Sequence, residues 1–328
     1  MNILIVCHAG KGVGLGHLKR SLVVAHSMQQ KFGAEIYFLV QGDSVNKDYL
    51  SGFEYQFLES NKDLSLMIRQ QVVTLDIQFI VFDLFSQHVP DNFGDLLEEL
   101  KRNDCKLISV DGLIDYHNKL DLIFIPSFNF SSPPDLKIDT PILFGWDCYL
   151  LNIKKKQIKW QQGRHVLVLT GGSDTTKLGK TLPGQLNNVL PENTKLNWVT
   201  GPFSDRPLFP KNNKFEMLNH QAPSALDELM IKSNYALTVF GVSFFELLYY
   251  GVPTVVFSPY GNKDDNELKV IESEGVALVA RDEVDAITKL KTLMDNDKLA
   301  ASLSEMSKII MSVPGEKKFT QAVLELVV

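Results

Sequence analysis

A regular alternation of short apolar segments with stretches of helical periodicity constrains this chain more than any other feature. The apolar segments are typical of buried strands, and they fall at residues 3–6, 35–40, 79–82, 106–110, 122–125, 165–169, 196–199, 236–240, 254–257 and 276–279. Helical patterns lie between them, for example at 18–30 and 91–102, and the tail from 282 to 328 is mostly helical. Strands separated by helices form βαβ units and a parallel sheet covered on both faces. The sequence therefore predicts an α/β fold.

The alternation stops at residues 126–141, which contain Ser-Phe-Asn-Phe-Ser-Ser-Pro-Pro and have no period. Such a stretch predicts the start of an interdomain connection. A chain of 328 residues is also long enough for two domains. We therefore predict two Rossmann-like domains with parallel sheets, residues 1–145 and 146–328, that face each other across a cleft. The two halves share no residue-level repeat.

Composition excludes several classes of protein. A net charge of −6 argues against nucleic-acid binding, which needs a basic face. The three cysteines have no paired spacing, so we expect a reducing compartment and neither a disulfide framework nor a zinc module. The apolar run at residues 3–6 is too short for a signal peptide or a membrane span. We therefore expect a cytoplasmic protein with no integral membrane segment.

A glycine-rich loop follows the first predicted strand. Gly10, Gly12, Gly14 and Gly16 stand at alternate positions, and a predicted helix begins near Gly16. Glycine lets the backbone approach a ligand closely, and a helix N-terminus offers free N–H groups and a positive dipole end. Because open α/β sheets bind ligands at the carboxyl ends of their strands, the loop is a candidate phosphate or anion site. A purely structural strand–helix turn is the alternative.

This loop lacks the dinucleotide fingerprint Gly-x-Gly-x-x-Gly, because Leu15 and His17 stand where the third glycine would be needed. A nicotinamide dehydrogenase is therefore disfavoured. His17 lies in the first turn of the predicted helix, whose dipole disfavours a protonated imidazole. A neutral His17 beside a phosphate site could act as a general base, or it could only hydrogen-bond the loop. His8 ends a strand and His26 lies on a helix face, so we assign neither to the site.

A second glycine turn follows the predicted strand at 165–169. Gly171, Gly172 and Ser173 precede Asp174 there, and we expect this turn to line the cleft. Residues 174–181 nearly form a P-loop. Asp174 occupies the position of the first glycine, however, and its charge is unsuited to phosphate, so an ATPase is excluded.

The most informative segment is 236–254. A predicted strand ends at Gly241 and a helix starts near Ser243, so the N–H groups of Val242, Ser243 and Phe244 could hold a diphosphate. Glu246, one turn further, could accept hydrogen bonds from both ribose hydroxyls. The alternative is a capping box, Ser243-x-x-Glu246. Both roles are compatible because a carboxylate has about four acceptor sites.

The loop at 258–267 follows the next predicted strand. It carries Asn262 and Asn266, whose side chains would face the cleft. The alternative is a solvated loop with a helix cap at Asp264 or Asp265.

These segments, in this order, resemble the SpsG/PseG-like family of nucleotide-sugar enzymes, which has the GT-B fold and includes a UDP-sugar hydrolase. The resemblance covers most of the chain. The matching segments are 14–20 (Gly-x-Gly-His-x-x-Arg), 82–83, 109–111, 143–151, 171–174 (Gly-Gly-x-Asp), 241–246 (Gly-x-Ser/Thr-x-x-Glu), 251–253 (Gly-x-Pro) and 262–266 (Asn-Gln-x-x-Asn, with Lys263 in place of Gln).

The resemblance implies that His17 is the catalytic base and Asn262 a second active-site residue. It also implies that Ser243 and its neighbours bind the diphosphate and that Glu246 binds the ribose. The chain departs from the hydrolase at three positions that bear on sugar recognition. These are Phe85 instead of a Tyr, Gly112 instead of a second Asp after Asp111, and Asn152 instead of an Arg.

We therefore expect a UDP-sugar enzyme that breaks the bond between the anomeric carbon and the phosphate. Backbone amides and helix dipoles would hold the leaving diphosphate, so no metal or other cofactor is expected. The motif order favours water as the acceptor. A glycosyltransferase with a glycan or lipid acceptor is the first alternative, because Lys11 and Lys19 could serve an anionic acceptor. A non-catalytic nucleotide-sugar-binding protein is the second.

Overall fold

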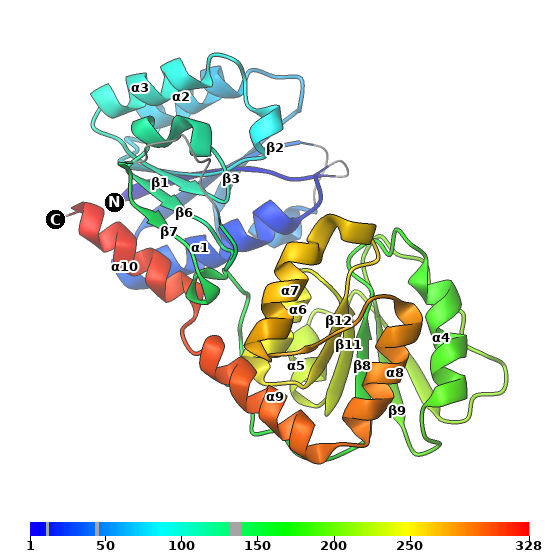
Figure 1. The fold of residues 1–328 in the computed structure, drawn as a ribbon. Coiled ribbons are helices and arrows are strands. Elements are labelled where there is room, and N and C mark those ends of the chain that lie inside the picture. Colours follow the sequence, from blue (N-terminus) through cyan, green and yellow to red (C-terminus); the bar gives the residue numbers. More distant parts are fainter. Residues whose placement is uncertain (11–12, 43–45, 131–138, 328) are drawn as a thin grey trace. The chain divides into compact units, whose positions relative to one another are not determined.

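The computed structural model describes residues 1–10, 13–42, 46–130 and 139–327, and Figure 1 shows its ribbon. The chain forms two compact units, each built on one parallel sheet. Unit 1 comprises Met1–Asn152 and the C-terminal segment that begins at Val313, and unit 2 comprises Ile153–Ser312.

The sheet of unit 1 has seven strands in the order β3-β2-β1-β4-β5-β6-β7, and all neighbouring pairs are parallel. The strands are β1 (Asn2–His8), β2 (Glu35–Gln41), β3 (Glu54–Leu58), β4 (Phe79–Asp83), β5 (Lys106–Val110), β6 (Leu122–Phe124) and β7 (Ile142–Leu143). The chain order reverses between β1 and β4, so connections from these two strands leave in opposite directions. This is the point at which open α/β sheets bind ligands.

Helices cover both faces of this sheet. Side chains alternate between the two faces along each strand, and the central strands carry apolar side chains on both faces. The helices are α1 (Gly16–Phe32), α2 (Leu64–Thr74), α3 (Phe93–Arg102) and α10 (Gly315–Val327), with short 3₁₀ helices η1 (Lys47–Leu50), η2 (Ser86–His88), η3 (Ile114–Lys119) and η4 (Trp146–Cys148). In β1, Ile5 belongs to the core formed with α1 and α10, whereas Leu4 and Val6 belong to the core formed with α2 and α3.

The sheet of unit 2 repeats this plan with six strands in the order β10-β9-β8-β11-β12-β13. Its strands are β8 (His165–Leu169), β9 (Lys195–Thr200), β10 (Glu216–Gln221), β11 (Tyr235–Val239), β12 (Thr254–Phe257) and β13 (Leu278–Val279). Its helices are α4 (Leu178–Val189), α5 (Leu226–Ile231), α6 (Val242–Tyr250), η5 (Gly261–Asp264), α7 (Asp265–Glu274), α8 (Glu283–Met294) and α9 (Asp297–Ile310). The order reverses between β8 and β11, next to the start of α6.

The α/β class, the parallel sheets and the helical tail predicted from the sequence are confirmed. Three strands were not predicted, β3, β7 and β10, and all three lie at a sheet edge. The residues of β3 and β10 are largely exposed or half-buried, so the sequence shows no continuous apolar run there, and β7 has only two residues.

The division of the chain differs from the predicted single boundary at residue 145. The interdomain connection does not start at residues 126–130 as predicted, because β7 follows later in the chain and pairs with β6 in the first sheet; residues 131–138 lie outside the described part. Unit 1 continues to Asn152, and α10 returns to it. The physical cause is apolar burial: Phe319 of α10 is fully buried, with its ring centroid 5.2 Å from that of Phe124.

Candidate functional site

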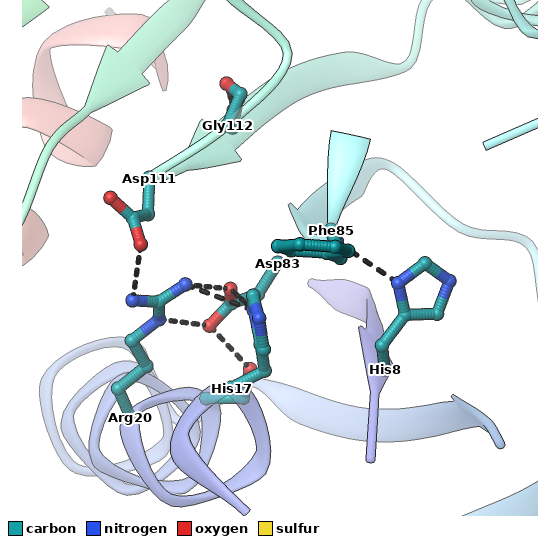
Figure 2. Close-up of polar contacts among 9 residues, drawn as sticks. His8, His17, Arg20, Asp83, Phe85, Asp111 and Gly112 are labelled. Atoms are coloured by element: carbon teal, nitrogen blue, oxygen red, sulfur yellow. Dashed lines mark hydrogen bonds and ion pairs between the residues drawn. The ribbon is translucent and has the colours of Figure 1, made fainter. Parts of the chain in front are cut away.

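Four polar side chains meet in unit 1 at the carboxyl ends of β1, β4 and β5 (Figure 2). His17 and Arg20 lie three residues apart on the first turns of α1, so they share one face of the helix. Asp83 is the last residue of β4, and Asp111 follows β5. The sheet order therefore brings together residues that are far apart in the sequence, at the reversal point of the sheet.

Asp83 lies at the centre of this cluster, with only 1% of its side chain exposed. Its Oδ1 is 2.6 Å from His17 Nδ1 and 2.6 Å from Arg20 Nη2, and its Oδ2 accepts a 2.7 Å hydrogen bond from Arg20 Nε. Burial alone would raise the pKa of Asp83, but the Arg20 guanidinium and the bond from His17 hold that pKa below its ordinary value. Asp83 is therefore an ionised carboxylate.

The contact with Asp83 determines which nitrogen of neutral His17 carries the proton. An ionised carboxylate only accepts hydrogen bonds, so a nitrogen 2.6 Å away must donate. Nδ1 of His17 therefore carries the proton, and Nε2 keeps its lone pair. Arg20 Nη2 also lies 2.9 Å from Nδ1, because both nitrogens donate to the same oxygen. A histidine held in this way has the geometry of a general base.

Asp111 completes the cluster from the loop after β5. Its Oδ2 accepts a 2.6 Å hydrogen bond from Arg20 Nη1, and 42% of its side chain is exposed. Asp111 and Leu113 both have left-handed backbones, with φ of 65° and 63°, which costs free energy unless the surroundings hold it. A Cβ at Gly112 would lie 2.9 Å from the Leu84 carbonyl oxygen, so the loop packs tightly on the segment after β4.

His8, which was not assigned a role from the sequence, holds the backbone of the segment after β4, next to the cluster. It is 2% exposed, and its Nδ1 accepts a 2.9 Å hydrogen bond from the backbone N–H of Phe85. The Phe85 ring meets the His17 ring edge-on, with centroids 6.4 Å apart. Burial lowers the pKa of His8 to about 4. His8 therefore stays neutral near neutral pH and holds the backbone of a residue next to the candidate base.

Two glycines of the loop after β1 are hydrogen-bonded to each other. Gly10 and Gly14 exchange two backbone hydrogen bonds of 3.1 and 2.7 Å, and Gly14 has a φ of 82° that favours glycine. α1 begins at Gly16, and among the residues that the structure describes no side chain caps it. The first N–H groups of α1 therefore remain at the end of β1, beside His17. Lys11 and Gly12 lie outside the described residues.

In unit 2, the predicted diphosphate site lies at the start of α6. The helix begins at Val242, so Ser243 is inside the first turn and cannot form the capping box with Glu246. The N–H of Phe244 donates to the Gly241 carbonyl at 3.0 Å, and the Phe244 side chain is fully buried. Of the three predicted amides, those of Val242 and Ser243 therefore remain at the open end of the helix.

The other predicted residues of unit 2 lie at the same edge of its sheet. Gly171, Gly172 and Ser173 follow β8 and are exposed, and Asn262 and Asn266 follow β12 and are exposed. The hydroxyls of Thr175 and Tyr260 lie 3.1 Å apart and join the loops after β8 and β12. Since β11 lies between β8 and β12, these loops flank the start of α6.

Asp174 has a structural role, in agreement with the rejection of a P-loop. Its two carboxylate oxygens accept hydrogen bonds from the N–H groups of Leu178 and Gly179, at 2.9 and 2.8 Å. It thereby caps α4. Among the predicted site residues, Gly14, Gly16 and His17 belong to unit 1 and all others to unit 2.

Neither a metal-binding cluster nor a membrane-spanning helix is present in the described part of the chain. No group of three or more His, Cys, Asp or Glu in the described ranges is arranged to hold a metal ion. No helix among them is long and apolar enough to cross a bilayer.

Comparison with known proteins identifies the fold. No protein-family model matches the chain. It is 25% identical over 280 residues to the uncharacterized protein MJ1062 of Methanocaldococcus jannaschii, over 78% of this chain and 55% of that protein, so it spans about half the length of this relative. Similar solved structures include MurG of Acinetobacter baumannii, with a TM-score of 0.66 and 14% identity over 99% of both chains.

Two further structures contain a nucleotide. UGT2 of Phytolacca americana, complexed with UDP-2fluoro-glucose and pterostilbene, matches with a TM-score of 0.66 and 14% identity over 98% of this chain and 99% of that one. The MnaA–UDP complex of S. aureus matches with a TM-score of 0.63 and 12% identity, over 99% and 97% of the two chains. These similarities establish the GT-B fold predicted above.

The depressed pKa of His8 predicts a specific acid sensitivity. The pKa falls from 6.5 to about 4 on folding, so between these values the unfolded chain binds more protons than the folded one. Folding stability should therefore decrease as the pH falls from 6.5 to 4, by up to about 3 kcal/mol. The contribution of ionised Asp83 to folding stability is lost only below this pH range, because the pKa of Asp83 is lowered from 3.8.

Denaturant unfolding at several pH values checks this prediction. His8→Asn keeps an acceptor for the Phe85 N–H but does not titrate, so its stability should fall less over the same window. Equal pH dependence of the wild type and the variant would contradict the assignment of this loss to His8.

Proposed function

We propose that this chain transfers a sugar from a nucleotide-activated donor to an acceptor, with His17 as the general base. The observation that carries the proposal is the His17–Asp83 pair at the reversal point of the first sheet. Nδ1 of His17 donates to Asp83, so Nε2 keeps a lone pair and can act as the base. The similar structures support transfer better than hydrolysis, since they include the glycosyltransferase SnogD of Streptomyces nogalater, with a TM-score of 0.62 and 13% identity.

The chemistry follows from this geometry. The acceptor oxygen attacks the anomeric carbon while its proton moves to Nε2 of His17. The bond between the anomeric carbon and the phosphate oxygen breaks, and the nucleoside diphosphate leaves with the electron pair. The resulting imidazolium keeps its Nδ1–H bond to the ionised Asp83, which stabilises the positive charge. General base catalysis of this kind contributes roughly 10²–10⁴ in rate.

Unit 2 supplies the groups suited to the leaving nucleotide. The amides of Val242 and Ser243 and the N-terminal dipole of α6 would hold the diphosphate, with Gly171, Gly172 and Ser173 beside it. Glu246 lies four residues after Val242, on the same face of α6, where it would bind the ribose. Asn262 and Asn266 would contact the donor sugar. We propose UDP as the nucleotide and no metal requirement, because amides and the dipole balance the charge.

Removal of the Glu246 carboxylate tests the nucleotide site. Glu246→Ala should weaken UDP binding by about 1.5–3 kcal/mol, the range for hydrogen bonds to a charged group. Titration calorimetry in the presence of EDTA measures this and tests the metal-free site together. Glu272→Ala, an exposed carboxylate on α7 of the same unit, should bind UDP like the wild type. Equal affinity of Glu246→Ala, or binding that requires magnesium, would contradict this site.

Hydrolysis is the second candidate function, because the segment 14–20 resembles the UDP-sugar hydrolase and the same base could deprotonate water. Purified protein with a panel of UDP-sugars separates the two. We expect UDP release to be slow alone and to accelerate when a glycan or polyprenyl phosphate acceptor is added. Stoichiometric free sugar and UDP without any acceptor would assign a hydrolase instead.

His17→Ala should lower either reaction roughly 10²–10⁴-fold without changing UDP affinity, because the base and the nucleotide groups belong to different units. A wild type that binds UDP-sugars but never releases UDP would identify a non-catalytic binding protein and contradict the proposal.

A further inference from the structure

We infer that Arg20 is a positioning residue, which fixes the tautomer of His17 through Asp83 and is itself held in place by Asp111. The inference deepens the proposed function and rests on it only for the role of His17 as a base. The tautomer itself is a property of the resting protein and is measured without substrate.

Arg20 is already engaged within the protein. All three guanidinium nitrogens lie within hydrogen-bond distance of a carboxylate: Nε and Nη2 bond Asp83, and Nη1 bonds Asp111. One guanidinium faces two carboxylates, so the three side chains carry a net charge of about −1. An arginine beside a glycine loop would ordinarily be a candidate ligand for phosphate. Here its charge is balanced by the protein, so Arg20 acts on the site through its neighbours.

The way in which Arg20 binds Asp83 determines the state of that carboxyl group. The two-pronged contact uses both oxygens and fixes the plane of the carboxylate, with Oδ1 toward His17. Burial by itself favours the protonated form of an aspartic acid. Because arginine does not lose its proton, the pair keeps Asp83 ionised, and Asp83 can only accept a hydrogen bond from Nδ1 of His17.

Loss of the Arg20–Asp83 pairing would change which ring nitrogen of His17 carries the proton. A protonated Asp83 could donate to Nδ1 of His17, and the ring proton would then reside on Nε2. The nitrogen needed as the base would lose its lone pair. A rotated Asp83 would no longer accept the Nδ1–H bond, and the proton would no longer be held on Nδ1. Through its contacts with Asp83, Arg20 therefore controls whether His17 can accept a proton from an acceptor hydroxyl.

Asp111 supplies the third anchor. Its carboxylate binds Nη1 at 2.6 Å from a loop whose left-handed backbone at Asp111 and Leu113 is held by contacts on both sides. Ser109 Oγ donates to the Gly112 carbonyl, and Gly112 packs against Leu84. Strained backbone of this kind persists where the surroundings fix it. The loop thus holds the guanidinium in the orientation that Asp83 requires.

His8 provides a reference within the same molecule. Its Nδ1 accepts the Phe85 N–H, so neutral His8 must carry its proton on Nε2. The two histidines therefore have opposite tautomers, and only that of His17 depends on Arg20.

Two-bond ¹H–¹⁵N correlation spectra of the full chain labelled with ¹⁵N-histidine test this at neutral pH. Signals are assigned with His17→Asn and His8→Asn. In the wild type we expect protonated Nδ1 for His17 and protonated Nε2 for His8. In Arg20→Lys the single ammonium group cannot reproduce the fork, so His17 should shift to the Nε2–H form or to a mixture, while His8 remains unchanged.

Arg69→Lys is the matched control, because it alters another arginine–carboxylate pair of unit 1, between Arg69 Nε and Glu99 Oε2 at 2.8 Å. It should leave His17 unchanged. Asp111→Gly removes the third anchor and suits the positive φ at that position, so it should also give a mixture of His17 tautomers. If Arg20→Lys does not fold, Asp111→Gly tests whether the arginine controls the His17 tautomer.

Two results would overturn the inference. One is a wild-type His17 protonated on Nε2, and the other is an unchanged Nδ1–H pattern in folded Arg20→Lys, or in Asp111→Gly if that protein alone folds. With an active UDP-sugar in hand, Arg20→Lys should lower kcat about 10–100-fold and leave the KM for the donor unchanged. Absence of any turnover would refute the proposed function but leave the tautomer result standing.

Discussion

A carboxylate excluded from water organises the first unit of this protein. Asp83 is held as an ion by two nitrogens of Arg20 and one of His17, which bind its oxygens. These partners lie on α1 and Asp83 ends β4, so the pairing depends on the parallel neighbours β1 and β4. The fold thereby places His17, with its proton on Nδ1, at the point between β1 and β4 where the strand order reverses.

The two sheets use the same construction for different chemistry. In unit 1 the reversal point holds His17, Arg20 and two carboxylates, whereas in unit 2 it holds the start of α6 and two flanking loops joined through the hydroxyls of Thr175 and Tyr260. The first arrangement is suited to moving a proton and the second to holding an anion. A proton acceptor and an anion site are the two groups that the proposed transfer of a sugar from a nucleoside diphosphate requires.

Local patterns in the sequence predicted the buried parts of the fold and the loops that bear the site. Buried parallel strands appear as apolar runs, but the edge strands β3 and β10 do not. The glycine loop pointed to His17, whereas its contact with Asp83, 66 residues away, leaves no local spacing signal. An aspartate that directly follows an apolar strand was the available clue to Asp83. The return of α10 to unit 1 was missed because helical periodicity does not identify the partner of a buried face.

Asp83→Asn tests the central claim most directly, because it keeps the shape of the side chain and removes the charge that holds the His17 proton on Nδ1. The measurement is the rate at which the enzyme releases UDP from a UDP-sugar that is its substrate, in the presence of the acceptor. UDP affinity and thermal unfolding of the variant are measured as controls. The account predicts a rate roughly 10²–10⁴-fold below the wild type with unchanged UDP affinity in a folded protein. A folded Asp83→Asn protein with wild-type turnover would contradict it.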